Sequence, residues 1–293
     1  MGVLLFKKLN FFSYMNIKFL LIILTLPFVL FSCKNENSKG FKNESLKYSL
    51  IEKDSIIEEV MHVTLQAGIN SQRRREVLDS ALIEYPTFAY FYQQRAMPFY
   101  KQDKDELGLP FLEKAAELDP QRYLDYMAFM KCIFSKNYRA AINDFENVLE
   151  LYGESYIMDH TYYFYIGISY LQLNEFEKAK ISLQKSINQT EEEDGREWVH
   201  FLDLMYLGIA NLELYEYESA IVAFDEALLQ YKEFSDVKYY KAICLYALGK
   251  NEQGKDMLDE TIKDLTNGNT INEDNVIYER YPYQIRKSWF GIQ

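Results

Sequence analysis

The side chains in this 293-residue sequence that are best suited to bind a metal or to take part in catalysis are three histidines, His62, His160 and His200. Histidines that bind a metal from one helix lie three or four positions apart, as in HExxH, and these three are much further apart. The sequence also contains no G-x-S-x-G, no glycine-rich phosphate loop and no CxxC pair. We therefore expect no metal, no cofactor and no enzymatic activity.

Composition narrows the class of protein further. Apolar residues make up 48% of the chain, which is enough for a packed core, and Gly (12) and Pro (6) are scarce, as in proteins built from long helices. The formal net charge is −12 and the sequence pI is about 4.9, so a polyanion would be repelled. We expect no nucleic-acid partner.

The first targeting feature is an apolar run over residues 19–31, which is too short to cross a bilayer but has the length of a secretory signal core. The run ends in Leu30-Phe31-Ser32-Cys33, which resembles a bacterial lipobox. The resemblance implies that residues 1–32 are a lipoprotein signal peptide and that Cys33 carries acyl chains such as palmitate. The alternative is an ordinary signal peptide with a chance cysteine at its end. A short positive start at Met15 makes Met15 a possible true initiator.

Removal of residues 1–32 deletes three lysines and no acid, which takes the formal charge from −12 to −15. Anionic headgroups would repel such a chain, so membrane attachment must come from the lipid on Cys33. Residues 33–52 are polar and aperiodic and are expected to form a lipidated flexible linker. In enteric lipoproteins, an aspartate just after the lipidated cysteine retains the protein at the inner membrane, and this chain has Lys34 and Asn35 there instead. We expect a protein of the bacterial cell envelope, lipid-anchored in the outer membrane and facing the periplasm.

The rest of the sequence is repetitive, and residues 163–186 are its clearest unit. Two helical patterns, marked by Gly167 in the first and by Ala179 and Leu183 in the second, are joined by a short polar turn. Gly208 and Phe224 repeat this arrangement, and equivalent positions further along the chain, 220 and 254, are 34 residues apart. Small residues let paired helices approach closely, while the larger side chains fill the space between pairs.

This pattern resembles the tetratricopeptide repeat, of the kind found in bacterial lipoproteins of Bacteroidetes. The resemblance implies an all-α, right-handed superhelical solenoid of about six helix pairs over residues 53–268, followed by a C-terminal capping segment. The expected units are residues 53–88, 89–122, 123–155, 160–193, 201–234 and 235–268.

In that family, partners bind in a concave groove lined by the first helix of each pair. The positions that match this lining are mostly aromatic or aliphatic: Tyr90, Met97, Tyr100, Tyr123, Tyr126, Met130, Phe164, Ile168, Met205, Ile209, Tyr239, Ile243 and Tyr246. As a partner-binding groove, they would fit an apolar or aromatic-rich segment of an envelope protein or peptide. The alternative is that they form the core between helices.

Residues 269–293 leave the repeat pattern and carry several aromatic residues around Pro282, so they are too apolar to remain unpacked. One hypothesis is that this aromatic tail caps the last helix pair; the other is that it folds back into the groove and competes with a ligand. The sequence does not indicate an oligomeric state.

Together these features predict a non-catalytic protein-protein interaction scaffold of the cell envelope. The alternative is a lipoprotein that captures a ligand or nutrient such as a glycan, with aromatic side chains stacking on sugar rings.

Overall fold

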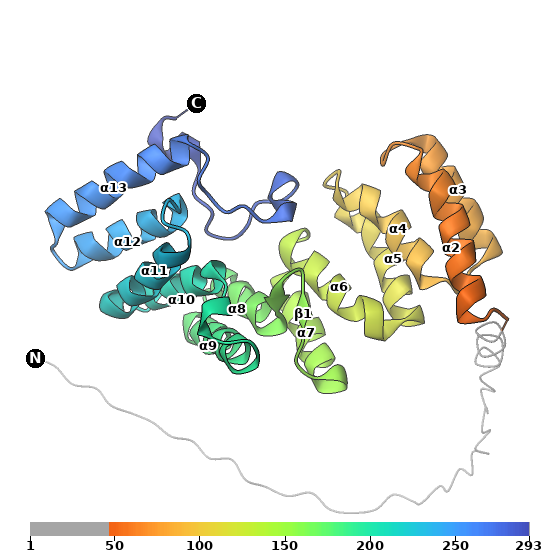
Figure 1. The fold of residues 1–293 in the computed structure, drawn as a ribbon, viewed down its shortest axis with the longest axis horizontal. Coiled ribbons are helices and arrows are strands. Elements are labelled where there is room, and N and C mark those ends of the chain that lie inside the picture. Colours follow the sequence, from red (N-terminus) through yellow and green to blue (C-terminus); the bar gives the residue numbers. More distant parts are fainter. Residues whose placement is uncertain (1–46, 293) are drawn as a thin grey trace, which may run out of the picture. The chain divides into compact units, whose positions relative to one another are not determined.

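The computed structural model describes residues 47–292, which lie within one compact unit. The predicted signal peptide, Cys33 and most of the predicted linker lie outside the described residues. Within the described part, the helices form six successive pairs in chain order (Figure 1). The pairs are α2 (Leu50–Leu65) with α3 (Gln72–Glu84), α4 (Ala89–Tyr100) with α5 (Asp105–Leu118), α6 (Pro120–Ile133) with α7 (Tyr138–Tyr152), α8 (Tyr162–Gln172) with α9 (Phe176–Glu193), α10 (Phe201–Glu213) with α11 (Tyr217–Gln230), and α12 (Ser235–Ala247) with α13 (Asn251–Thr266).

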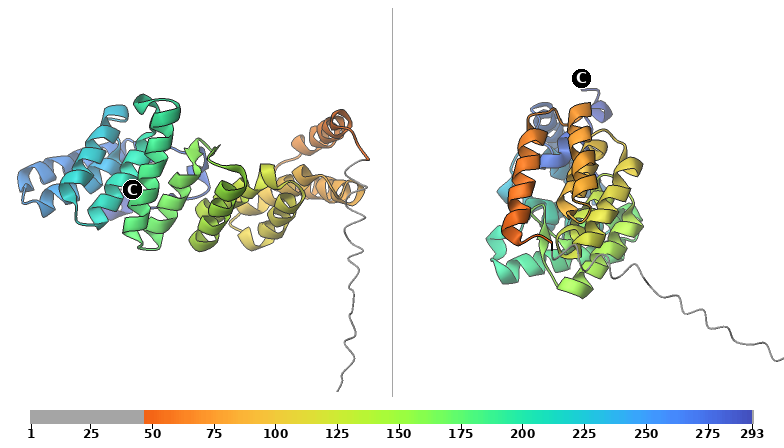
Figure 2. Two further views of the ribbon diagram at one scale, coloured as in Figure 1. Left: turned by 90° about the horizontal axis from the view of Figure 1, so that it is seen from below. Right: turned by 90° about the vertical axis from the view of Figure 1, so that its right-hand side faces the viewer.

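Each pair packs on the next, so the second helix of one pair contacts the first helix of the following pair. Figure 2 shows this succession from two further directions. The all-α solenoid predicted from the repeat is confirmed, and each predicted unit corresponds to one helix pair. Two boundaries were wrong: α2 begins at Leu50, inside the predicted linker, because Ser49 caps it, and α6 begins at Pro120, inside the preceding predicted unit.

Close helix approach within the pairs depends on the glycines that marked the repeat. A Cβ atom added to Gly167 would lie 2.6 Å from Cγ of Leu183, and one added to Gly208 would collide with the ring of Phe224. The absence of a side chain therefore lets α8 contact α9, and α10 contact α11, at short distance.

The turn within each of the last five pairs contains one residue with a positive φ angle: Asp103, Lys136, Asn174, Tyr215 and Gly249. Only Gly249 takes this left-handed conformation without steric cost from a Cβ atom. The same backbone conformation thus recurs with a different residue type in each turn, so no sequence motif marks these turns.

Two apolar cores lie within the described residues. The larger runs from α4 to the tail, and a smaller one joins α2 and α3 to the start of α4 through Met61, Leu78, Ala81, Phe88 and Phe91. The first helix pair therefore has its own packing cluster.

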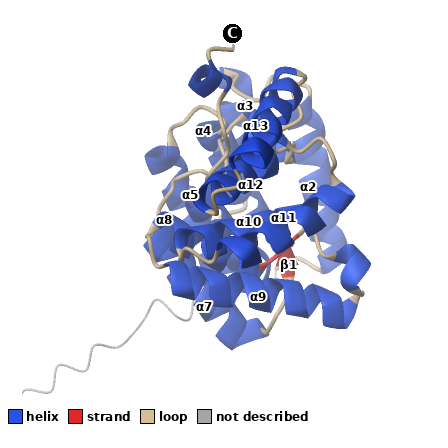
Figure 3. Cartoon of the chain, turned by 90° about the vertical axis from the view of Figure 1, so that its left-hand side faces the viewer, coloured by secondary structure: helices blue, strands red, loops and turns tan. Residues whose placement is uncertain are grey.

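Between the third and fourth pairs, the described chain forms a short antiparallel hairpin of β1 (Tyr156–Ile157) and β2 (His160–Thr161) (Figure 3). Met158 and Asp159 between them both have positive φ, as a two-residue hairpin loop requires. Residues 156–159 lie between the predicted units 123–155 and 160–193, and the repeat pattern predicts no strand there. The hairpin turns the buried side chain of His160 toward α10.

The tail after α13 contains two short 3-10 helices, η2 (Asp274–Ile277) and η3 (Lys287–Phe290). Its end packs on the last helix pair: η3 contacts α13, and the ring of Tyr239 on α12 lies 6.0 Å from Trp289 and 5.7 Å from Phe290. The expected capping contact is present, but a 3-10 turn makes it rather than a long helix.

Candidate functional site

Helices α6, α8, α10 and α12 contact one another in order and form one face of the solenoid, which we call the first-helix face. The tail folds back across it. Tyr206 on α10 donates a 2.9 Å hydrogen bond to the carbonyl of Pro282, and Tyr240 on α12 donates one of 2.6 Å to the carbonyl of Tyr283. The tail therefore occupies the part of this face that α10 and α12 form.

The tail also reaches the earlier repeats. Lys136, in the turn between α6 and α7, donates a 2.8 Å hydrogen bond to the carbonyl of Arg280 and lies 3.3 Å from the carboxylate of Glu279. The ammonium of Lys101, which follows α4, lies 4.8 Å from the ring centre of Tyr278. Both sequence hypotheses for the tail thus describe part of it: its end caps the last pair, and its middle lies across the first helices.

The aromatic and aliphatic residues predicted to line the groove divide into two groups. Seven are buried in the helix-packing core, although Tyr123 also lines the cavity described below: Tyr100, Tyr123, Met130, Phe164, Ile168, Met205 and Ile209. Four are half-buried, namely Tyr90, Met97, Tyr126 and Tyr239, while Ile243 and Tyr246 are exposed at 36% and 40%. For the seven buried residues, the core alternative describes the side chains, because each first helix packs on both its own partner and its neighbours.

A cavity of about 350 Å³ lies at the N-terminal end of the unit, among α2, α4 and α6. We call it the N-terminal cavity; its lining includes Lys53, Ile57, Phe88, Tyr90, Arg122 and Tyr123. The guanidinium of Arg122 lies 5.8 Å from the ring centre of Tyr90 and 5.6 Å from that of Tyr123. The cavity thus combines an aromatic lining with two cationic side chains and two acidic ones, Asp54 and Asp119, and no tail residue lines it.

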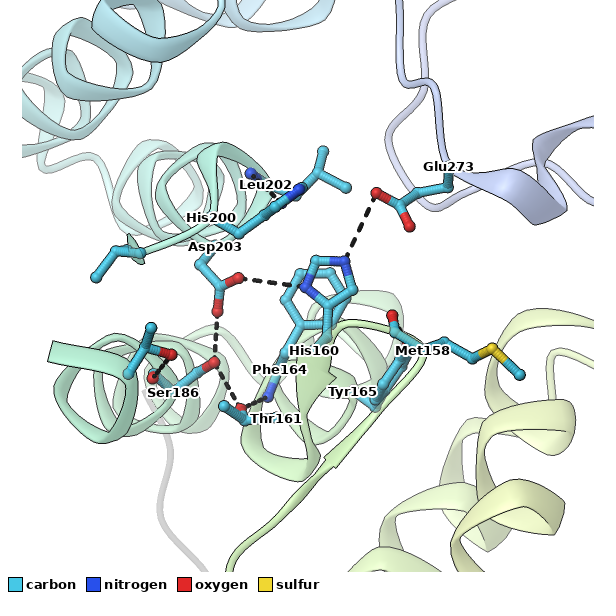
Figure 4. Close-up of polar contacts among 12 residues, drawn as sticks. Met158, His160, Thr161, Phe164, Tyr165, Ser186, His200, Leu202, Asp203 and Glu273 are labelled. Atoms are coloured by element: carbon cyan, nitrogen blue, oxygen red, sulfur yellow. Dashed lines mark hydrogen bonds and ion pairs between the residues drawn. The ribbon is translucent and has the colours of Figure 1, made fainter. Parts of the chain in front are cut away.

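A second candidate lies where the tail meets the hairpin, and Figure 4 shows its polar contacts. His160 Nδ1 lies 3.4 Å from a carboxylate oxygen of Asp203 on α10, and His160 Nε2 lies 3.6 Å from Oε1 of Glu273 in the tail. His200, the residue before α10, places its ring 4.8 Å from that of His160. We call His160, His200 and Glu273 the histidine cluster.

The charges in this cluster are strongly coupled. Burial disfavours protonation of His160, but the carboxylates of Asp203 and Glu273 outweigh that effect and raise its pKa to about 9. Burial and the neighbouring His160 cation lower the pKa of His200 to about 4. Burial opposes ionisation of Glu273 as well, yet the charge on His160 keeps the pKa of its carboxyl below the usual value. Without a bound ion, the protonated His160 ring therefore lies between the side chains of Asp203 and Glu273.

Sequence reasoning did not find the histidine cluster because its members are far apart in the chain. His160 and His200 are 40 residues apart, and Glu273 lies in the tail, whose path no repeat pattern predicts. One signal was present in the sequence. His160 lies just before α8 and His200 lies just before α10, so both stand at the start of the first helix in neighbouring repeats. The expectation that the sequence holds no metal-ligating group rested on local spacing alone.

Comparison with known proteins agrees with this architecture. Residues 162–189 match the family model of the tetratricopeptide repeat. PilW, described as a widely conserved type IV pilus biogenesis factor, superposes with a TM-score of 0.57 at 13% identity, covering 75% of this chain and 94% of that one. A tetratricopeptide repeat protein from Parabacteroides merdae gives a TM-score of 0.57 at 15% identity, covering 72% of this chain and 79% of its own. The C-terminal part of a TPR repeat-containing protein from Cytophaga hutchinsonii gives a TM-score of 0.54 at 17% identity, covering 72% of this chain and 80% of that one.

No curated protein matches the sequence. The described unit is a tetratricopeptide repeat solenoid, and at these identities the structural similarity establishes the fold alone. Among residues 47–292, no helix has the length and apolar character needed to span a bilayer.

Proposed function

We propose that this chain is a non-catalytic scaffold of the bacterial cell envelope that binds a segment of another envelope protein at its N-terminal cavity. One observation carries the proposal: the tail covers the C-terminal part of the first-helix face and leaves the N-terminal cavity, with Tyr90 and Tyr123 in its lining, to a partner. Aromatic side chains supply large contact areas at low entropic cost. The charges of Lys53 and Arg122 are offset in the lining by Asp54 and Asp119, so the aromatic and apolar contacts, with the Arg122 guanidinium beside Tyr90 and Tyr123, favour binding of that segment.

The proposal for cellular location rests on the sequence. An acylated Cys33 would hold the chain at the outer membrane, facing the periplasm, and the residues between Cys33 and the start of α2 would separate the solenoid from the lipid surface. Replacement of Cys33 by Ser should move the protein from the membrane to the soluble fraction and abolish labelling with a palmitate analogue. Membrane retention by the Cys33→Ser variant would contradict the lipid anchor.

The binding site is tested by photocrosslinking in native cells. A photoreactive residue at position 90 should trap one envelope protein, and the Arg122→Glu change should reduce that product strongly, whereas Gln121→Glu on the neighbouring exposed residue should not. A photoreactive residue at position 239, which the tail aromatics cover, is the matched control. Equal trapping from positions 90 and 239, or a product unaffected by Arg122→Glu, would rule out this cavity as the binding site.

The fold comparison contains no observation that favours glycan capture, so we do not propose that function.

A further inference from the structure

The histidine cluster brings three metal-ligating side chains together from three separate parts of the chain: β2, the residue before α10, and the tail (Figure 4). One potential ligand atom from each of His160, His200 and Glu273 lies within 4.8 Å of the others. Two imidazoles and one carboxylate form a common ligand set for Zn²⁺, which completes its coordination with water.

The burial of His160 and the unpaired Nε2 atom of its ring are the first argument for a bound cation. His160 is only 2% exposed, and its Nε2 atom has no hydrogen-bond partner. Nδ1 faces a carboxylate oxygen of Asp203, and Nε2, on the other side of the ring, faces Oε1 of Glu273. A buried nitrogen without a hydrogen-bond partner and a carboxylate oxygen thus face each other, which is the arrangement that two ligands of one metal ion take.

The spacing favours the metal ion. A proton shared between a histidine and a carboxylate brings the two heavy atoms to about 2.7–2.9 Å. Two ligands of a tetrahedral zinc ion, each at about 2.0–2.1 Å from the metal, lie about 3.4 Å apart. The observed Nε2 to Oε1 distance of 3.6 Å is close to the second value, whereas the ligand atoms of the whole set lie within 4.8 Å of one another, so His200 must move to complete the site.

The surroundings of His160 supply the second argument. Asp203, which holds Nδ1 of His160, accepts a hydrogen bond from the hydroxyl of Ser186, and that hydroxyl lies 2.6 Å from the hydroxyl of Thr161. Zinc-binding histidines are oriented in this way, by a carboxylate that is itself hydrogen-bonded. The outer shell of a metal site is therefore already assembled, from side chains that are all buried.

We propose that His160, His200 and Glu273 bind one Zn²⁺ ion that joins the tail to the first-helix face. His160 and Glu273 need little movement. His200 binds through Nε2, so its ring proton moves to Nδ1, and the 3.3 Å hydrogen bond that Leu202 donates to that atom is released. The N-terminal cavity takes no part in this site, so the inference is independent of the proposed partner binding.

The test uses the full-length chain, treated with a chelator and titrated with Zn²⁺ in a calorimeter. We expect one equivalent to bind, the melting temperature to rise, and Co²⁺ to give the visible absorption of a tetrahedral site. Glu273→Gln and His160→Gln should each weaken Zn²⁺ binding at least about 10-fold. Asp274→Asn, an exposed charge change on the adjacent residue, and His62→Gln, on the exposed surface of α2, should leave it unchanged.

The ion-free alternative is that the cluster is held only by protons. Absence of saturable binding at one equivalent, or binding retained in both Glu273→Gln and His160→Gln, would overturn the metal site. If His160→Gln fails to fold, Glu273→Gln decides the question, because Glu273 is only partly buried and glutamine preserves its size.

Discussion

The phenol of Tyr206, buried in α10, donates a 2.9 Å hydrogen bond to the backbone carbonyl of Pro282 in the tail. Proline has no amide hydrogen of its own to offer a neighbour, so the carbonyl is the only polar backbone group that this residue contributes. A side chain in the middle of the solenoid thus fixes the position of a segment that the repeat pattern does not include.

Replacement of Tyr206 by Phe should destabilise the chain by about 1–3 kcal/mol, because the buried carbonyl of Pro282 loses its donor while the packing of the ring is kept. Urea unfolding measures this loss. Amide exchange should increase in residues 278–285 before it increases in α10. Tyr215→Phe, at a residue that is 77% exposed, is the control and should change stability little.

Deletion of residues 273–293 should lower the melting temperature and increase binding of a hydrophobic dye. The deletion removes the buried side chains of Tyr281 and Ile285, each worth about 1.5–3 kcal/mol of apolar burial, and uncovers their contacts on α10 and α12. Circular dichroism should still show a helical solenoid. An unchanged melting temperature would contradict the packing of the tail described above.

The acid dependence of stability should contain a contribution from Asp236, whose carboxylate accepts hydrogen bonds from the amide of Ile285 and the hydroxyl of Thr270. Burial raises the pKa of Asp236 from 3.8 to about 6, although these hydrogen bonds oppose the shift. The folded chain therefore holds more protons than the unfolded chain between those pH values. The contribution of Asp236 to stability is present below about pH 4 and is lost as the pH rises to about 6.

The Asp236→Asn variant isolates this effect, because asparagine does not titrate. The free energy of unfolding of the natural chain, relative to Asp236→Asn, should fall between pH 4 and pH 6 by an amount on the order of 3 kcal/mol. A difference that stays constant over this range would show that Asp236 titrates at its ordinary pKa.

Addition of a methyl group at Gly208 should be costly. A Cβ atom there collides with the ring of Phe224, which is fully buried, so Gly208→Ala should destabilise the chain by about 1–3 kcal/mol. Gly68→Ala is the matched control, because a Cβ atom at Gly68 meets nothing within 4 Å. Thermal unfolding of the two variants compares the same substitution with and without the close contact.

The fold was predictable because helix pairing leaves a local signature in the sequence. Gly208 and Phe224 lie 16 residues apart, and their contact depends only on two neighbouring helices, so one repeat is enough to reveal it. The burial of Met205 and Ile209 was harder to predict. A first helix in a solenoid packs on three sides, and an apolar residue at the supposed groove position has the same pattern as one in the core.

The path of the tail and the histidine cluster could not be predicted from such local patterns. Glu273 meets His160 across 113 residues of chain, and the meeting depends on a hairpin whose loop residues, Met158 and Asp159, are not the usual Asn or Gly. The physical reason is that long-range contacts in a repeat protein are set by the added segment, not by the period.

The smaller core of the first helix pair has a consequence for how the molecule comes apart. Repeat arrays lose structure stepwise, because each repeat contacts only its immediate neighbours. Here the tail is hydrogen-bonded both to Lys136 and to Asp236, so it connects the third pair to the last pair, and we expect these pairs to unfold together. Helices α2 and α3 are not among these pairs. Opening should therefore begin at this end, which also borders the N-terminal cavity, so that fraying of α2 would adjust the width of the site without loosening the rest.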